Sequence, residues 1–241
     1  MRLGNILRTL VPGPGVHLAR RVAQALDPHT NFSYAQEGED MLLLRLFNWR
    51  THGFYVDVGA HHPFRFSNTA MLHNLGWRGI KIDADPDLIQ EFDRHRPRDK
   101  NLAVGVSDAA GRMRLHKFDE PALNTFDEAT AASLVSGGIY KELSCREVAV
   151  ERLETLLEKH LAPGQAIDLL NIDAEGRDMN VLRSNDWTRF RPGIVLVEQR
   201  ARTMSEALAG DANTFLTAHG YELIAKTVNT LVLRDQTRSP A

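Results

Sequence analysis

The sequence predicts an α/β fold, a Rossmann-like and mostly parallel seven-stranded sheet with helices on both faces and a C-terminal antiparallel hairpin. Three observations lead to this prediction. Short apolar runs typical of strands alternate with segments of helical periodicity. Polar residues follow those runs directly, at the points where parallel strands would end. Two alternating segments, 221–227 and 230–235, are separated only by Val228 and Asn229, which indicates a hairpin.

The first half of the chain predicts three helices. The first covers 35–48 and places four apolar residues on one face, Leu42, Leu43, Leu46 and Phe47. The second is expected to be capped by Ser67 and stopped by Gly76, and the third to begin at Asp85 with Pro86 in its first turn. Apolar strands between these helices are predicted at 53–59, 79–84 and 101–107.

The second half begins with two alternating segments, 111–118 and 145–150, which predict a β-ribbon. The residues between them, 119–144, have weak periodicity and are predicted to form a substrate-facing insertion. Apolar strands at 166–174 and 193–199 then alternate with helices at 150–161, 177–186 and 205–219.

Composition excludes several classes of function. The formal charge of −2 and the pI of about 6.6 give no global attraction to polyanions, so nucleic acid is not an expected partner. Cys145 is the only cysteine, which rules out an intrachain disulfide and suits a reducing compartment. No apolar run is long enough to cross a membrane, and no signal-peptide core is present. We therefore expect a cytoplasmic protein, and nothing in the sequence indicates its oligomeric state.

The N-terminus, residues 1–32, is interpreted as a basic extension before the main domain at 33–241. Its first 26 residues carry four arginines and no acidic residue, and apolar residues recur at helical spacing around Arg20 and Arg21. Two alternatives stay open. The segment could lie on a membrane surface or partner as an amphipathic helix, or it could be an extension packed on the domain.

Polar residues at three consecutive strand ends predict a binding site for one adenosine. Gly59 lets the backbone approach a ligand, and Asp57 beside it can accept hydrogen bonds. Asp83 ends the second strand, where a carboxylate can bind both hydroxyls of a ribose. Ser107 and Asp108 follow the third strand and are candidates for contact with the adenine. Further candidates around the cofactor are Gln36, Ala60, His61, Asn68, Thr69, Ala84 and Asp173.

The turn after the first strand favours a cofactor without phosphates. A dinucleotide needs backbone donors at a glycine-rich helix start, but "GAHHPFRFSN" offers one glycine, two histidines, a proline and aromatic residues. S-adenosylmethionine is a nucleoside cofactor that meets this condition, and its sulfonium cation suits a cleft lined by carboxylates. A nicotinamide-dependent oxidoreductase is the alternative enzyme.

Five ordered blocks resemble the FkbM family of methyltransferases over residues 33–235. They are "SYAQEGEDMLL", "GFYVDVGAHHPFRFSNT", "GWRGIKIDADP", "LLNIDAEGRDMNVL" and "RPGIVLVE". The resemblance implies a class I methyltransferase fold, S-adenosylmethionine as the methyl donor, and typically O-methylation of hydroxyls on sugars, polysaccharides or natural products. The first block departs slightly from the family, since Ala35 stands where a serine or similar residue is more usual.

Methyl transfer to a hydroxyl needs an aligned acceptor and a group that takes its proton. His61 and His62 lie in the cofactor turn and are candidates for that base, as are Asp173 and Glu175 after the fourth strand. Asp173 and Glu198 could instead hold a divalent cation such as Mg²⁺, although the sequence has no compact ligand motif and we favour a metal-free site.

Other polar residues near the site have two interpretations each. Ser67, Asn68 and Thr69 could orient cofactor or acceptor, or simply begin a helix. Gln36 and Glu37 could reach over the donor, or belong to an acidic helix start that complements the helix dipole. The third class of function, a non-catalytic cofactor-binding module of the same fold, also stays open.

Overall fold

A computed structural model describes residues 29 and 31–238 of the 241-residue chain. Contacts divide the chain into two units, residues 1–33 and 34–241, and all the elements named below belong to the second. The arginines of the predicted N-terminal extension lie outside the described residues, so its predicted membrane contact stays a prediction. Within the described part, no helix is long and apolar enough to cross a membrane.

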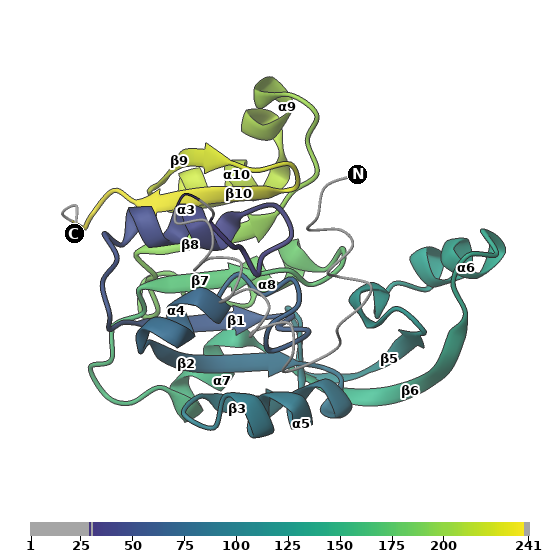
Figure 1. Ribbon diagram of the computed structural model, residues 1–241. Helices are drawn as coiled ribbons and strands as arrows, with labels where there is room; N and C mark the ends of the chain where they lie inside the picture. The colour runs from purple at the N-terminus through teal and green to yellow at the C-terminus, as the bar shows by residue number, and fades with distance from the viewer. Residues whose placement is uncertain (1–28, 30, 239–241) are drawn as a thin grey trace. The chain divides into compact units, whose positions relative to one another are not determined.

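The predicted seven-stranded sheet is confirmed, with the order β3-β2-β1-β7-β8-β10-β9 (Figure 1). The first five strands in this order run parallel, and the hairpin of β9 and β10 closes the sheet in the antiparallel sense. The order reverses between β1 and β7, which is where ligands bind in open α/β sheets. The strands are β1 Phe54–Val58, β2 Arg78–Asp83, β3 Lys100–Ala103, β7 Leu169–Ile172, β8 Ile194–Glu198, β9 Tyr221–Lys226 and β10 Thr230–Asp235.

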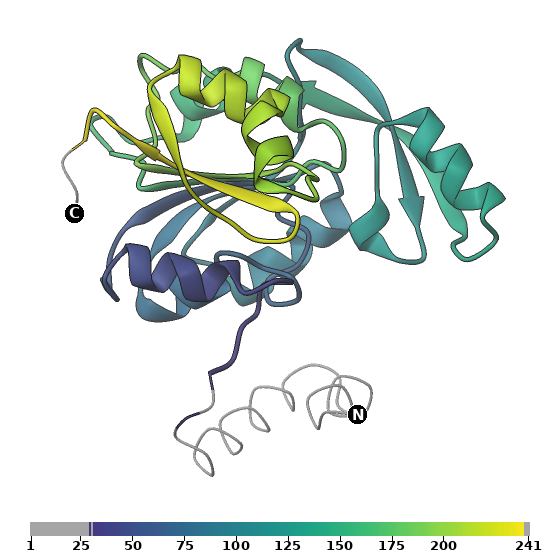
Figure 2. The same ribbon diagram turned by 90° about the horizontal axis from the view of Figure 1, so that it is seen from above.

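Helices cover both faces of this sheet because alternate strand residues bury apolar side chains on opposite sides (Figure 2). Tyr55 and Leu169 pack in the cluster that contains Leu43 and Leu72, whereas Val56 and the helices of the second half belong to the other cluster. The helices on the first face are α3 Glu39–Leu46, α4 Ala70–Leu75 and α5 Pro86–His95. The second face is covered by α7 Leu153–His160, α8 Asp178–Arg183, α9 Met204–Ala209 and α10 Asp211–Ala218.

A second, three-stranded sheet with the order β4-β6-β5 extends away from the large sheet (Figure 1). It contains the predicted ribbon, and Asp85 joins it to α5 through ion pairs with Lys117 at 2.7 Å and Arg146 at 2.6 Å. The predicted insertion contributes the two short helices at its end. These elements are β4 Gly105–Val106, β5 Gly111–Phe118, η1 Pro121–Leu123, α6 Glu128–Ser136 and β6 Glu142–Glu151.

Two predicted elements are each divided in the structure. The third strand, predicted as 101–107, splits at Val104, because β3 pairs with β2 while β4 leaves to pair with β6. The helix predicted at 205–219 becomes α9 and α10, separated at the extended Gly210. Gln199 fills that break, since its side-chain oxygen accepts from the backbone N–H groups of the first turn of α10 at 3.0 and 3.2 Å.

Two local predictions near α3 and α4 were wrong in detail. Leu43, Leu44 and Phe47 are the buried apolar residues of the first helix and its C-cap, whereas the predicted Leu42 and Leu46 are only half-buried. Ser67 does not cap α4, which begins at Ala70, because its hydroxyl accepts from Arg96 at 2.9 Å. The end of α4 at Gly76, with φ 115°, and the capping of α5 by the Asp85 side chain are confirmed.

Candidate functional site

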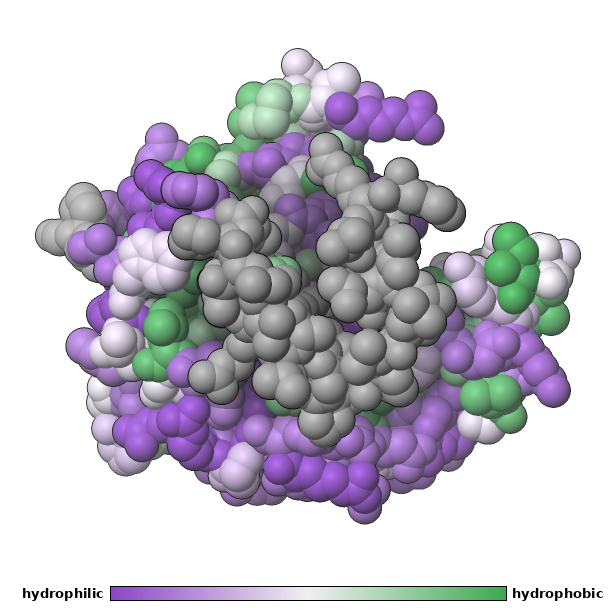
Figure 3. Space-filling view, in the orientation of Figure 1, coloured by the Kyte–Doolittle hydropathy of each residue, from purple (hydrophilic) through white to green (hydrophobic). Residues whose placement is uncertain are grey.

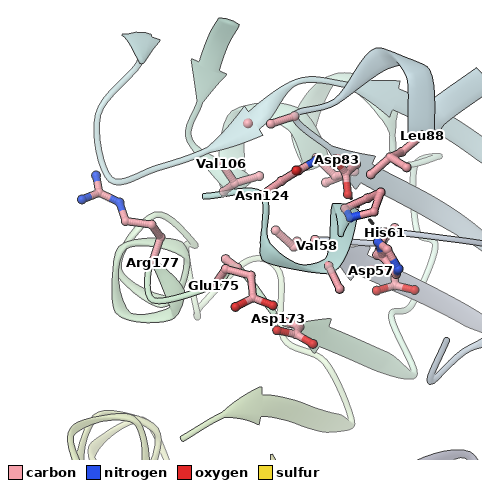
Figure 4. Close-up of a pocket in the computed structure, with 18 of the residues that line it drawn as sticks. Asp57, Val58, His61, Asp83, Leu88, Val106, Asn124, Asp173, Glu175 and Arg177 are labelled. Carbon is pink, nitrogen blue, oxygen red and sulfur yellow. Dashed lines mark hydrogen bonds between the residues drawn. The ribbon is translucent and has the colours of Figure 1, made fainter. Parts of the chain in front are cut away.

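A cavity lies at the carboxyl ends of β1, β2 and β7, where the strand order reverses (Figure 4). We call it the strand-end cavity. Most of the predicted cofactor residues line it, namely Gln36, Asp57, Gly59, Ala60, His61, Asn68, Asp83, Ala84 and Asp173. Three of the predicted cofactor residues, Thr69, Ser107 and Asp108, lie outside its lining.

Gly59 forms the floor of this cavity through a turn that only glycine can adopt. Its φ is 74°, and a Cβ at this position would lie 1.7 Å from the backbone oxygen of Asp173. The N–H groups of Gly59 and Ala60 both donate to the backbone oxygen of Ile82, at 2.9 and 3.2 Å. The carboxyl ends of β1, β2 and β7 are therefore held close together. The backbone of Gly59 has no side chain between it and the cavity.

Asp83 is held with its carboxylate in this cavity. Its two oxygens accept from the backbone N–H groups of His61 at 2.9 Å and Asp85 at 2.8 Å. Burial raises the pKa of Asp83 to about 6, although these two hydrogen bonds lower it. A carboxylate oxygen can accept more than one hydrogen bond, so both can still bind the hydroxyls of a ribose.

The end of the cavity beyond β2 is apolar rather than polar. Leu88, Val104 and Val106 line it together with Leu115 and Phe126. The carboxylate of Asp108 accepts from the Ser107 hydroxyl at 3.2 Å, outside the lining. An adenine ring would thus meet hydrocarbon side chains instead of the predicted Ser107 and Asp108. Sequence reasoning missed the residues contributed by the second sheet and the insertion, because no local pattern links them to the strand ends.

Asp57 borders the cavity, but its carboxylate is committed to a buried ion pair. Oδ2 lies 2.6 Å from the Lys81 ammonium and accepts from Thr69 at 2.8 Å, while Oδ1 accepts from Asn171 at 2.8 Å. Burial acts to raise the pKa of Asp57, but the charge of Lys81 and these hydrogen bonds outweigh it, so the pKa is lowered. Burial lowers the pKa of Lys81 to about 8, which leaves it charged at neutral pH. The Asp57–Lys81 ion pair therefore stabilises the ends of β1 and β2 that line the cavity.

The loop between β1 and α4 is fixed by the same network. Arg96 is fully buried and donates to Ser67 at 2.9 Å, to Thr69 at 3.0 Å and to the backbone oxygen of Pro63. Asn68 points the other way, into the cavity, and donates to Asn171 at 2.9 Å. Thr69 therefore has a structural role, whereas Asn68 is available to a ligand.

The two predicted histidines have different environments. His61 lines the strand-end cavity, and neither of its buried ring nitrogens has a hydrogen-bond partner within the described part of the chain. Burial, followed by the charges of Arg65 and His62, lowers the pKa of His61 to about 4, so it is neutral at pH 7. His62 lies outside the cavity lining, and its Nδ1 accepts from the N–H groups of Phe64 and Arg65 at 3.0 and 2.9 Å. Of the pair, only His61 can contact a ligand in this cavity.

A second cavity adjoins the first, and we call it the acidic cavity. The two share Asp173 and Glu175, and Gln36 and Asn68 also line both. The acidic cavity is rich in carboxylates and amides from distant parts of the chain. Its lining includes Glu37, Glu39, Glu120, Glu198 and Asn229 together with Arg65 and Arg200.

The two shared carboxylates are poised to bind a proton. Desolvation, followed by repulsion from Glu198, raises the pKa of Glu175 to about 7. Desolvation and the charges of Glu175 and Glu198 likewise raise the pKa of Asp173 well above its usual value. Figure 4 shows the two side chains next to each other at one side of the strand-end cavity. Glu175 also has a φ of 46°, a strained conformation for a residue with a side chain and one that occurs mostly at functional sites.

Within the described part of the chain, the three strand-end acids Asp173, Glu175 and Glu198 do not form a group whose ligand atoms all lie within 4.8 Å of one another. Glu198 lies 3.1 Å from the Arg200 guanidinium, which competes with a cation for its carboxylate. Among the described residues, His116, Glu142 and Cys145 form the one group of three that does converge in this way.

Of the two interpretations given for Gln36 and Glu37, contact with a ligand or a structural role at the helix start, the structure favours a different one for each residue. Both oxygens of Glu37 accept from Asn229, at 2.9 Å from its backbone and 2.8 Å from its side chain, which ties the start of α3 to the β9–β10 turn. Gln36 is exposed and lines both cavities. Gln36 is thus the residue of this segment that can reach a ligand.

Comparison with known proteins identifies a family that matches the chain. A family model described as the methyltransferase FkbM domain matches residues 57–223, which is more than half of the chain. Among solved structures, the chain is similar to the methyltransferase FkbM from Methylobacillus flagellatus KT, with 10% identity and a TM-score of 0.45. That match covers 86% of this chain and 45% of the other, so this chain spans less than half of its length. No curated protein matches the chain.

Proposed function

The chain belongs to the FkbM methyltransferase family, and from that premise we propose that it transfers a methyl group from S-adenosylmethionine to a hydroxyl oxygen of a polar acceptor such as a sugar. The observation that carries the proposal is the pair of adjoining cavities that share Asp173 and Glu175. One cavity suits a nucleoside and the other suits a hydroxylated molecule.

The residues of the strand-end cavity fit the donor. Asp83 can accept from ribose hydroxyls, the backbone at Gly59 allows close approach, and the apolar end beyond β2 suits an adenine. When bound, S-adenosylmethionine supplies an electrophilic methyl group on a positively charged sulfur. The carboxylate of Asp173, at the border of the two cavities, would favour that positive charge.

The acidic cavity fits an acceptor with several hydroxyl groups. Carboxylate and amide side chains line it, and those not already paired within the described part of the chain, such as Gln36 and Glu175, can accept from or donate to hydroxyl groups. Arg65 is held there by a bidentate pair with Glu120, with both distances at 2.7 Å. A sugar or polysaccharide acceptor could use many of these groups at once, whereas a hydrocarbon acceptor could use few.

We assign the role of general base to Glu175. Its pKa of about 7 matches the pH of the cell, where a base both binds and releases a proton readily. His61 is a weaker base because its pKa is about 4, so its neutral ring is better suited to orienting the acceptor by a hydrogen bond. Asp173 stays beside it as a second candidate base.

Calorimetry with S-adenosylhomocysteine tests the donor, and transfer of labelled methyl groups to a panel of sugars tests the reaction. Binding of S-adenosylhomocysteine but not of NADH is expected, because the turn after β1 lacks the glycines that cradle a pyrophosphate. Folded protein that binds NADH alone would favour the oxidoreductase. Binding without turnover on any hydroxylated acceptor would favour a non-catalytic module.

Replacing Asp83 should weaken donor binding. We expect Asp83→Ala to raise the Kd for S-adenosylhomocysteine about tenfold or more, because two charge-assisted hydrogen bonds to the ribose are lost. Calorimetry measures the change. Asp108→Ala is the matched control, since Asp108 also follows a strand but lies outside the cavity lining, and its affinity should match the wild type. Equal affinity of the Asp83 variant and the wild type would reject the ribose role.

Removal of divalent cations should leave methyl transfer intact. The acids at the strand ends do not converge as metal ligands, and Arg200 already neutralises Glu198. We therefore expect the same initial rate in a chelator as in added Mg²⁺. A rate that falls in the chelator and returns with Mg²⁺ would instead support the cation held by Asp173 and Glu198.

A further inference from the structure

A second group of reactive side chains lies on the ribbon, outside both cavities described above. His116 on β5 and Cys145 on β6 are directly opposite each other in the antiparallel pairing. The Cys145 sulfur lies 3.9 Å from His116 Nε2, and Glu142 Oε1 lies 2.8 Å from His116 Nδ1. His116 is buried, with 8% of its surface exposed, whereas Cys145 is exposed. The ring is therefore held between a carboxylate and an accessible thiol.

This arrangement has the order of groups that activates a nucleophile. Glu142 fixes the imidazole so that Nε2 points at the sulfur, and an imidazole at that position can take the proton of the thiol. The thiolate, not the thiol, attacks electrophiles. Arg114 adds a positive charge near the thiol, and its interaction with Cys145 raises the pKa of its guanidinium.

A shallow pocket adjoins the group and offers space for an incoming molecule. Arg114, His116, Glu128 and Glu142 line one part of it, and Ala131 and Val135 of α6 line another. Arg114 pairs with Glu128 at 3.4 Å, so the charges of this part are largely matched within the protein. Figure 3 shows hydrophobic, green atoms at the projecting end of the molecule where α6 lies. The apolar wall suits a small molecule with a nonpolar part.

We propose that Cys145 is a reactive thiol that forms a mixed disulfide with small disulfides that carry a nonpolar part, with His116 as its base and Glu142 as the residue that positions the base. His116 Nε2 takes the proton from the Cys145 sulfur. The thiolate then attacks one sulfur of the disulfide R–S–S–R, a new S–S bond forms to Cys145, and the old bond breaks. The leaving group departs as the thiolate RS⁻, so no other oxidant is required.

A zinc site is the competing interpretation of the same three residues, and the geometry favours it less. A ligand atom from each of the three residues lies within 4.8 Å of the others, but three ligands are fewer than the four of a structural zinc site, and Glu142 Oε1 already lies at hydrogen-bond distance from His116 Nδ1. The cation of Arg114 lies beside the sulfur, where it would repel a metal ion.

The probe for the proposal is 5,5′-dithiobis(2-nitrobenzoate), an anionic aromatic disulfide that releases a coloured thiolate. Since Cys145 is the only cysteine, the whole signal reports on it. We expect the native protein to react about tenfold faster or more than the same protein unfolded in urea. Each rate is divided by the rate of a free thiol in the same urea concentration, which removes the effect of urea on the reaction itself. Equal or slower reaction of the native protein would overturn the proposal.

Variants separate the positioned base from simple exposure. We expect His116→Gln and Glu142→Gln each to lower the native rate toward that of the unfolded chain, while Glu147→Gln keeps the wild-type rate. Glu147 is the matched control because it lies on the same strand and pairs with Arg112 instead. Circular dichroism checks that each variant is folded. If the His116 variant does not fold, the Glu142 variant provides the test. Native rates that do not differ among the variants, or protection of the thiol by one equivalent of Zn²⁺, would contradict the proposal.

Discussion

Replacement of Glu175 by Gln is expected to lower kcat for methyl transfer about 10²- to 10⁴-fold, the range that a positioned general base contributes. Gln has nearly the same shape but cannot accept the proton of the acceptor hydroxyl. Steady-state kinetics at saturating donor and acceptor measure the change. The Kd for S-adenosylhomocysteine should stay within about threefold of the wild type, because the substitution conserves size and the ribose ligand Asp83 is untouched.

The pH profile provides a second test of the same residue. Because the pKa of Glu175 in the free protein is about 7, its basic form is lost as the pH falls through that value, so wild-type kcat/KM should rise between about pH 6 and 8. The Gln variant should lose this rise. Glu37→Gln is the matched control, since Glu37 also lines the acidic cavity but both of its oxygens are bound by Asn229. A Glu175→Gln enzyme with wild-type kcat would transfer the assignment to Asp173.

Replacement of Lys81 by Met is expected to lower the free energy of unfolding by about 3–5 kcal/mol, the usual cost of leaving one member of a buried ion pair without its partner. Lys81 and Asp57 are both buried, and their charged atoms are 2.6 Å apart. Without the ammonium, Asp57 keeps only its hydrogen bonds from Thr69 and Asn171. Urea unfolding followed by circular dichroism measures the loss.

The double variant Asp57→Asn/Lys81→Met distinguishes a charge effect from lost packing. It removes both charges, so it should be more stable than Lys81→Met alone even though it carries one more substitution. Arg189→Met is the control, since Arg189 pairs with Glu158 on the surface and should cost less than about 1 kcal/mol. If Lys81→Met and the control unfold at the same urea concentration, the ion pair does not support the sheet.

The hydrogen bonds around the Asp57–Lys81 ion pair connect the core of the fold to the strand-end cavity. The Thr69 hydroxyl accepts a hydrogen bond from Arg96 and donates one to Asp57. Asn171 donates to Asp57 and accepts from Asn68, which lies in the strand-end cavity. The loop that carries His61 is therefore held in part by Thr69 and Arg96, which lie outside the cavity lining. A weaker ion pair should therefore make the loop that lines the cavity less rigid, in addition to lowering the stability of the fold.

The sequence by itself determined the features that depend on neighbouring residues. The mostly parallel sheet with a C-terminal hairpin was expected from the alternation of strands and helices, and Gly76 and Asp85 were assigned as helix ends from capping chemistry. Gly59 and Asp83 were located by their spacing after two strands, and both line the strand-end cavity. These signals are local, because they come from backbone conformation and from the period of apolar residues.

Only the tertiary structure decided what each polar side chain faces. Asp57 is bound by Lys81, 24 residues later, and Asn171, 114 residues later, so the strand end alone could not show that its carboxylate is committed to the core. His61 and His62 are adjacent in sequence but only the first lines the cavity. The pKa of about 7 at Glu175 depends on burial and on the charge of Glu198 at the end of β8. Such contacts arise when distant segments pack together, and the periodicity of one segment carries no information about them.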